Sequence, residues 1–226
     1  MIPWLEGAPG YAPLEQALTE PNGLLAAGGA LEPQWLLTAY RQGIFPWYSP
    51  GEPILWWSPD PRLVLLPDEL HISRSLRKTL RRRPFELRVD SAFSAVIEAC
   101  AAPRAPATGT WISAEMRAAY LAMHELGYAH SVECWRDGRL VGGLYGMALG
   151  RVSFGESMFS LATDASKVAF AHLVRFLRTQ GYAIIDCQMK TAHLMSLGAR
   201  EITRQQFRDI LDQHARAPQS LHRWSA

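Results

Sequence analysis

The 226-residue sequence is poor in cysteine and in long apolar runs, and these shortages exclude several classes of protein. Its three cysteines, Cys100, Cys134 and Cys187, are odd in number and widely spaced, which indicates buried reduced thiols rather than a disulfide framework. No segment approaches the ~18 consecutive apolar residues of a membrane-spanning helix. Residues 1–6 lack the basic stretch and apolar run of a secretory signal. We therefore expect a soluble, cytoplasmic protein without a membrane partner.

Metal-ligand spacing and a strong charge of either sign are also missing. The seven histidines are scattered and no Cys-x-x-Cys pair occurs, so we expect no metal site. The formal net charge is only +2, so a nucleic-acid partner would have to be held by a local basic patch. The hydrophobic content of 48% is sufficient for one large domain or two unequal ones.

Proline, glycine and tryptophan are dense in the first sixty residues, where one regular helix is predicted over 33–42. The prolines that surround Trp47 and Trp56 are unfavourable for a helix or a central strand. This segment is therefore predicted to form an irregular wall lined by aromatic side chains. A boundary near residue 62 divides the chain into a small N-terminal domain, 1–62, and a larger domain, 63–226.

The larger domain has the pattern helix, three-strand meander, helix, strand. The meander is predicted over 129–160, with a tight turn at Asp137-Gly138, and the following helix over about 165–179, with Asp164 as its N-cap. A buried strand is predicted over 183–189, and residues 102–109 are predicted to form a loop. Ser73 and Ser113 are predicted to cap helices that reach about Arg83 and Leu126. The order resembles the core of the Gcn5-related N-acetyltransferase fold. The predicted fold class is thus α+β, with a mixed sheet flanked by helices.

The turn before the long predicted helix argues against coenzyme A as the acyl donor. Acetyltransferases of the similar fold hold the coenzyme pyrophosphate on backbone amides of a glycine-rich turn at this place. Here the turn, residues 160–164, contains no glycine and ends in an acid, whose charge would repel phosphate at the helix start. We expect no cofactor and a different acyl donor.

A basic stripe is predicted on the helix over 73–83. Arg74, Lys78, Arg81 and Arg82 recur at helical spacing and few acids are interleaved. Like charges three or four residues apart destabilise a helix unless an anion compensates them. The stripe is either a solvated helix face or, as we favour, a contact surface for nucleic-acid phosphates.

Two further stretches place polar side chains among apolar neighbours. Glu156 lies inside a predicted strand, on the same strand face as Met158. It requires a cationic or hydrogen-bonding partner, which is either an internal Lys or Arg or a substrate cation. Asp186 and Gln188 lie two residues apart at the end of a buried strand, so their side chains are expected to point the same way. They form either an internal polar pair or part of a ligand crevice.

Taken together, these stretches resemble the leucyl/phenylalanyl-tRNA–protein transferases of bacteria over about residues 21–207. The strings that carry the resemblance lie at 21–26, 40–47, 55–62, 71–75, 109–112, 124–127, 155–160, 165–167 and 185–188. The resemblance implies a small N-terminal domain on an acetyltransferase-like domain. It also implies transfer of Leu, Phe and, less well, Met from aminoacyl-tRNA to proteins that begin with Arg or Lys. The product would carry an N-end rule degradation signal.

The resemblance also implies a role for each candidate residue. Because the tRNA ester is already activated, the enzyme mainly has to hold the amine against the ester carbonyl and stabilise the oxyanion. Asp186 is expected to orient the amine or accept its proton, Gln188 to align Asp186 or donate to the oxyanion, and Glu156 to bind the acceptor cation. A vicinal ribose hydroxyl is the alternative proton carrier. The remaining residues are assigned to three surfaces. The terminal adenosine is bound by Trp47, Trp111 and Tyr120, and the aminoacyl side-chain pocket is formed by Leu144, Met158, Leu173 and Ile185. The tRNA phosphates are contacted by Arg74, Lys78, Arg81 and Arg82.

Two other functions compete with this one. The first is aminoacyl-tRNA-dependent transfer to a cell-wall peptide or lipid, whose enzymes usually repeat the domain or add a coiled-coil arm or membrane spans. The second is a tRNA-binding module without catalysis, against which Glu156 and the Asp186/Gln188 pair argue. Mass gain on an Arg-starting peptide incubated with leucyl-tRNA separates all three.

Overall fold

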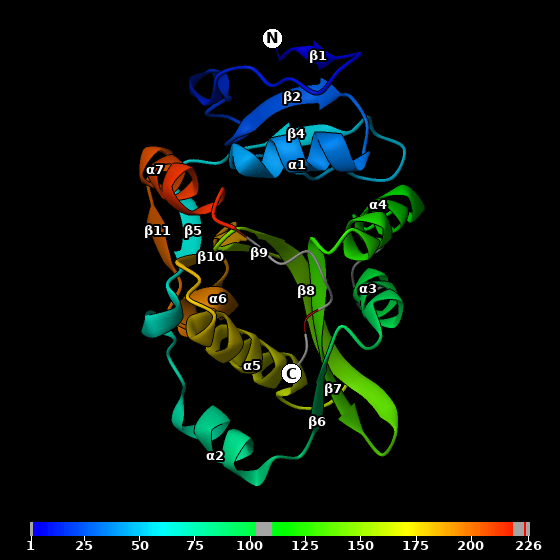
Figure 1. Ribbon diagram of the computed structural model, residues 1–226, viewed down its shortest axis with the longest axis vertical. Coiled ribbons are helices and arrows are strands. Elements are labelled where there is room, and N and C mark those ends of the chain that lie inside the picture. The colour runs from blue at the N-terminus through cyan, green and yellow to red at the C-terminus, as the bar shows by residue number, and fades with distance from the viewer. Residues whose placement is uncertain (1, 103–109, 219–223, 225–226) are drawn as a thin grey trace.

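The computed structural model describes residues 2–102, 110–218 and 224 (Figure 1). Two sheets organise this part of the chain. A four-stranded sheet belongs to the N-terminal segment, and a seven-stranded sheet with helices on both faces belongs to the remainder. The predicted fold class, a small N-terminal domain joined to a mixed sheet flanked by helices, is confirmed. Within these described residues, no helix has the length and apolar character needed to cross a membrane.

The N-terminal sheet has the strand order β1-β2-β4-β3, with the helix α1 against it (Figure 1). Its elements are β1 (Trp4–Leu5), the 3-10 turn η1 (Leu14–Gln16), β2 (Leu24–Gly28), α1 (Pro33–Arg41), β3 (Phe45–Pro46) and β4 (Leu55–Trp57). The expectation of an irregular wall without a central strand is wrong for β4, which is paired on both sides. Pro53 and Pro59 flank β4 without interrupting it, and Pro46 lies in the edge strand β3, where a missing N–H is tolerated.

The large sheet has the order β11-β5-β10-β9-β8-β7-β6, and β10 runs parallel to β9. Its strands are β5 (Arg62–Leu65), β6 (Glu86–Val89), β7 (Ala129–Arg136), β8 (Arg139–Leu149), β9 (Val152–Ser160), β10 (Ile184–Gln188) and β11 (Arg200–Ile202). The helices are α2 (Arg74–Arg82), α3 (Phe93–Ala101), α4 (Ala114–Glu125), α5 (Ala165–Thr179), α6 (Ala192–Ser196) and α7 (Arg204–His214), with the 3-10 turn η2 (Pro67–Glu69) after β5.

Two apolar cores lie on opposite faces of this sheet. One is shared by α3, α4, α7 and the N-terminal segment, and the other is centred on α5. Figure 1 shows α5 on one side of the sheet and α3 and α4 on the other. Along β8, Tyr145 belongs to the first core and its neighbour Leu144 to the second, as strand alternation requires. The middle of the sheet is therefore covered on both faces.

Most helix ends follow the predicted capping chemistry. The Ser73 side chain accepts a hydrogen bond from the backbone N–H of Leu76, and the Ser113 side chain accepts one from the backbone N–H of Met116. These hydrogen bonds cap the first turns of α2 and α4. Asp164 is not the side-chain cap that was predicted for α5. It has a left-handed φ of 64° and makes no capping bond, and its carboxylate instead accepts a hydrogen bond from Thr79 of α2 and pairs with Lys167. The predicted loop 102–109 lies, apart from its first residue, outside the described residues.

The three cysteines are buried and unlinked by disulfides, as predicted. Burial raises the pKa of the Cys134 thiol to about 12, and it raises the pKa of the Cys187 thiol as well. Both thiols therefore remain protonated and are poor nucleophiles at neutral pH. This chemistry leaves carboxylate and amide groups, rather than cysteine, as the reactive candidates.

Candidate active site

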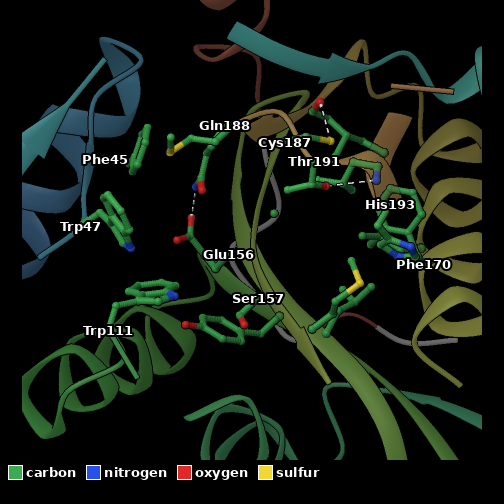
Figure 2. Close-up of a pocket in the computed structure, with 18 of the residues that line it drawn as sticks. Phe45, Trp47, Trp111, Glu156, Ser157, Phe170, Cys187, Gln188, Thr191 and His193 are labelled. Atoms are coloured by element: carbon green, nitrogen blue, oxygen red, sulfur yellow. Dashed lines mark hydrogen bonds between the residues drawn. The ribbon is translucent and has the colours of Figure 1, made fainter. Parts of the chain in front are cut away.

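A cavity of about 500 Å³ lies where the N-terminal segment meets β8, β9 and β10 of the large sheet (Figure 2). Its size is within the usual range for small-molecule sites. Figure 2 shows a polar and aromatic side formed by Phe45, Trp47, Trp111, Glu156 and Gln188, and a second side formed by Phe170, Cys187, Thr191 and His193. The cavity thus places an apolar space next to a small number of polar groups.

All four residues predicted for the side-chain pocket line this cavity, namely Leu144, Met158, Leu173 and Ile185. They come from three neighbouring strands and from α5. Phe170 and Cys187 complete the same wall, and sequence reasoning missed both of them. Phe170 precedes Leu173 by three residues on α5, so helical spacing could have identified it. Thr191 and His193 also line this side of the cavity, so a side chain that enters it would be surrounded mainly by apolar groups, with two polar side chains beside them.

Glu156 is presented to the cavity by a β-bulge in β9. Tyr145 of β8 pairs with Ser157 and the next residue, Gly146, pairs with Gly155, so Glu156 is the extra residue between them. Gly146 is required there, because a Cβ atom on it would lie 2.2 Å from the Phe154 carbonyl oxygen. The expectation that Glu156 and Met158 share a regular strand face therefore fails.

The Glu156 carboxylate accepts hydrogen bonds from three side chains. Oε1 accepts from the Tyr40 hydroxyl at 2.6 Å and from the Gln188 amide nitrogen at 3.2 Å, and Oε2 accepts from the Tyr120 hydroxyl at 2.8 Å. Burial raises the pKa of Glu156 to about 7, although these hydrogen bonds act in the opposite direction. None of the three partners is a cation, and no Lys or Arg of the described residues forms an ion pair with this carboxylate.

Asp186 is fully buried and does not line the cavity. Its two oxygens bind the Arg62 guanidinium in a fork, at 2.8 and 2.6 Å. Arg62 is itself buried, donates a third hydrogen bond to the Gly43 carbonyl, and lies over the rings of Phe45 and Phe207. Sequence reasoning missed Arg62, although it ends one of the strings on which the resemblance rests.

The side chains of Asp186 and Gln188 do not point the same way, contrary to the expectation from strand alternation. The pairing of β10 with β5 is irregular between them, and Gln188 has a left-handed φ of 61°. The Gln188 backbone N–H donates to Asp186 Oδ1 at 2.9 Å, while its side chain reaches Glu156. Asp186 therefore fixes the backbone that carries Gln188, and Gln188 is the one that faces the cavity (Figure 2).

The three aromatic residues expected at an adenosine site are not equivalent in the structure. Trp47 and Trp111 line the cavity on the same side, and Trp47 is 40% exposed at its edge (Figure 2). Tyr120 is fully buried beneath Glu156. Other aromatic residues of the N-terminal segment, including Tyr48 and Trp56 of β4, are core residues. An incoming base can thus reach Trp47 and Trp111 directly, whereas Tyr120 contacts Glu156.

The basic stripe lies on α2, away from the cavity and against the outer side of α5 (Figure 1). Arg74, Lys78, Arg81 and Arg82 are all exposed. Within the described part of the chain none of the four is in an ion pair. These charges are therefore available to an external anion.

Comparison with known proteins gives a consistent result. The family model described as "Leucyl/phenylalanyl-tRNA protein transferase" matches residues 64–212, and the model of the N-terminal domain of the same family matches residues 29–60. The leucyl/phenylalanyl-tRNA–protein transferase of Azoarcus sp. is 71% identical over 92% of this chain and 88% of its own length. That of Nitrosomonas europaea is 64% identical over 95% of this chain and 91% of its own length.

Similarity to solved structures is much weaker. A conserved protein of unknown function from Staphylococcus epidermidis has a TM-score of 0.44 at 11% identity, over 80% of this chain and 68% of its own. A GCN5-related N-acetyltransferase-like protein from Streptococcus suis has a TM-score of 0.37 at 14% identity, over 76% of this chain and 66% of its own.

Proposed function

The chain belongs to the leucyl/phenylalanyl-tRNA protein transferase family, and from this we propose that it transfers Leu or Phe, and less well Met, from aminoacyl-tRNA to proteins that begin with Arg or Lys. The observation that carries the proposal is the cavity, in which an apolar wall adjoins a carboxylate that has no cationic partner within the part of the chain that the structure describes. An apolar donor side chain and a cationic acceptor side chain suit these two surfaces.

We assign the donor side chain to the apolar wall. Leu144, Leu173 and Ile185 are each at most 5% exposed, and Met158 is half-buried. A charged side chain placed there would lose its hydration without gaining a partner, and this desolvation cost excludes it. The terminal adenosine of the tRNA then stacks on Trp47 and Trp111, and the stripe on α2 holds phosphates farther along the acceptor stem.

The acceptor side chain is assigned to Glu156. An N-terminal Arg or Lys supplies the cation that this carboxylate lacks, with a charge-assisted hydrogen bond between them. Gln188 is bonded to Glu156 and faces the cavity, so its amide lies where the acceptor amine and the ester meet. The degradation signal on the product follows from the bulky apolar residue that transfer adds.

The reaction is aminolysis of an ester: the amine nitrogen forms the new amide bond and the bond from the carbonyl carbon to the tRNA 3′-oxygen breaks. The proton that the amine loses passes to this leaving oxygen, with the vicinal ribose hydroxyl as its carrier. Free α-amines have a reference pKa of about 7.7–8.0, so a fraction is already nucleophilic at neutral pH. Gln188 is placed to donate a hydrogen bond to the oxyanion. Asp186 is buried and already bound in a fork to Arg62, so we assign it the positioning of Gln188 rather than direct removal of the amine proton.

One experiment tests the function as a whole. The protein is incubated with leucyl-tRNA and a peptide that begins with Arg, and the peptide mass is followed. We expect the addition of one leucine at the N-terminus, with no addition to a matched peptide that begins with Asp. No mass gain on the Arg peptide, with intact leucyl-tRNA still present, would reject the proposal.

A further inference from the structure

Three oxygen-bearing side chains from distant parts of the chain meet beneath the cavity. Tyr40 comes from α1 of the N-terminal segment, Tyr120 from α4, and Glu156 from the bulge in β9. Each of the three is in contact with the other two. The two hydroxyl oxygens are 2.5 Å apart, and they lie 2.6 and 2.8 Å from the Glu156 oxygens. Both tyrosines are fully buried.

When Glu156 is ionised, there are too few hydrogens for all three oxygen–oxygen contacts to be hydrogen bonds. Each phenol carries one hydrogen, so with ionised Glu156 there are two hydrogens for three oxygen–oxygen contacts. Two oxygens 2.5–2.8 Å apart without a hydrogen between them repel each other. A third hydrogen, on Glu156, makes every contact a hydrogen bond and closes a ring. Gln188 donates to Oε1 in either state.

The surrounding charges do not supply a substitute for this hydrogen. Tyr145 faces the cluster from β8, and Asp186 faces it from β10 with its charge compensated by Arg62 of β5. Among the described residues, Cys187 and His193 are the further titratable groups that line the cavity, and Figure 2 shows both on the side opposite Glu156. Burial raises the pKa of the Cys187 thiol, and the pKa of His193 is lowered by burial and by Lys167. The pKa of Glu156 near 7 agrees with a carboxyl that is protonated in a large fraction of molecules at neutral pH.

We propose that Glu156 in the empty acceptor site is a neutral acid, hydrogen-bonded in a ring with Tyr40 and Tyr120. A cationic N-terminal side chain binds by displacing the acidic proton of Glu156, and Tyr40 is a positioning residue for this exchange. The inference rests on the assignment of Glu156 to the acceptor side chain. The exchange is balanced: the carboxylic acid loses one proton to solvent through the open cavity, and the cationic side chain replaces its charge. Tyr40 thereby makes the acceptor site depend on the N-terminal segment.

The role proposed for Tyr40 depends on its hydroxyl and not on the packing of its ring. When Glu156 ionises, both phenols donate to the carboxylate, and the Tyr40–Tyr120 contact, which then lacks a hydrogen, must lengthen. A hydrogen bond to a carboxylate is roughly twice as strong as one to a neutral acid, so once this contact has relaxed the Tyr40 donation favours the ionised, cation-binding state over the empty one. The Tyr40→Phe variant retains the ring and its packing against Phe154 but cannot donate. Its Glu156 should hold the proton more tightly, because the hydrogen bond from Tyr40 lowers the pKa of that carboxyl.

The first measurement counts protons on the wild-type protein. Binding of an Arg-starting peptide is followed by titration calorimetry in buffers of different ionisation enthalpy, without aminoacyl-tRNA, so that no transfer occurs. The same peptide starting with citrulline, which is neutral but of similar shape, corrects for its α-amine. With a pKa near 7, the Arg peptide should release roughly 0.9 proton more than the citrulline peptide at pH 6 and roughly 0.1 more at pH 8. No difference at pH 6 would overturn the proposal.

The second measurement compares Tyr40→Phe with a matched control. Tyr48→Phe removes another buried hydroxyl that joins the N-terminal segment to the region of α4, through Ser113 at 3.4 Å, without touching Glu156. At pH 7.5 Tyr40→Phe should bind the Arg peptide about tenfold more weakly, regain affinity as pH rises, and keep its affinity for leucyl-tRNA. Tyr48→Phe should match the wild type. Unchanged affinity in Tyr40→Phe, or equal losses in both variants, would refute the role of Tyr40.

Transfer of leucine from leucyl-tRNA to the Arg peptide by the wild-type protein is measured first. Its absence would remove the proposed function, whereas normal transfer without proton release would remove only the exchange. The proton count uses the wild-type protein, so it decides the question even if Tyr40→Phe does not fold.

Discussion

Replacement of Arg62 by Met is expected to destabilise the protein strongly, because it leaves the Asp186 carboxylate buried without a cation. Arg62 is 1% exposed and Asp186 is 0% exposed. Removing one partner of such a pair typically costs about 3–5 kcal/mol. The Arg62 hydrogen bond to the Gly43 carbonyl is lost as well. For a chain of this length each kcal/mol lowers the melting temperature by roughly 2–4 °C, so the expected decrease is roughly 6–20 °C.

The assay is thermal and urea unfolding of the wild type, Arg62→Met, Asp186→Leu and the double variant. Because the double variant contains neither buried charge, it should recover at least half of the stability lost in Arg62→Met. The control is Arg88→Met, which breaks an exposed ion pair with Glu86 and should not change the melting temperature measurably. A loss below about 1 kcal/mol in Arg62→Met, or additive losses in the double variant, would refute the reasoning.

Three further predictions concern transfer. Glu156→Gln keeps the shape of the side chain but removes its charge, so kcat/KM for an Arg-starting peptide should fall roughly tenfold to a hundredfold, while the affinity for tRNA is retained. An unchanged kcat/KM would mean that Glu156 has only a structural role. Replacing Arg74 and Lys78 by Ala should flatten the salt dependence of tRNA binding by about 0.7–0.9 log units per lost phosphate contact, and an unchanged slope would reject the contact. The apolar wall around Leu173 should make transfer from leucyl-tRNA far faster than from aspartyl-tRNA, and equal rates would exclude it as the donor pocket.

Local signals in the sequence predicted the elements that depend on local chemistry. Ser73 and Ser113 start helices where their hydroxyls can satisfy free backbone N–H groups. Asp137-Gly138 forms the hairpin turn, with positive φ at both residues. Each of these features involves residues close together in the sequence. The four apolar residues of the donor pocket came instead from the family resemblance, and all four line one cavity.

The features that were missed depend on breaks in regular geometry. Alternation predicted that Asp186 and Gln188 point the same way, but the left-handed backbone at Gln188 turns one toward the cavity and leaves the other buried. The bulge at Glu156 similarly ends the alternation along β9. Asp164 was predicted as a cap because acids are common there, but it bonds to Thr79 of another helix. Neither a bulge nor a left-handed residue outside a tight turn, such as Gln188, has a reliable signal in a single sequence.

Contacts between distant segments were beyond the sequence for a different reason. Tyr40 and Glu156 are separated by 116 positions, and Arg62 and Asp186 by 124. Polar residues in apolar surroundings need partners, and this rule correctly identified Glu156 and Asp186 as unusual. It could not select the partners, because several tyrosines and arginines were available. Only the folded chain shows that Asp186 is paired with a guanidinium cation, whereas Glu156 accepts hydrogen bonds from two phenols.

This difference between the two carboxylates explains how one small site can hold both and use them differently. Asp186 has its charge compensated within the protein, so it gains nothing from an external cation and can serve as a fixed support for Gln188. Glu156 has hydrogen-bond donors but no cation among the described residues, so its ionised state is completed only by a ligand. If a Lys or Arg were introduced beside Glu156, this internal cation would occupy the place of the acceptor side chain. We therefore propose that the lack of a cation beside Glu156, among the described residues, makes the acceptor site selective for a cationic N-terminus.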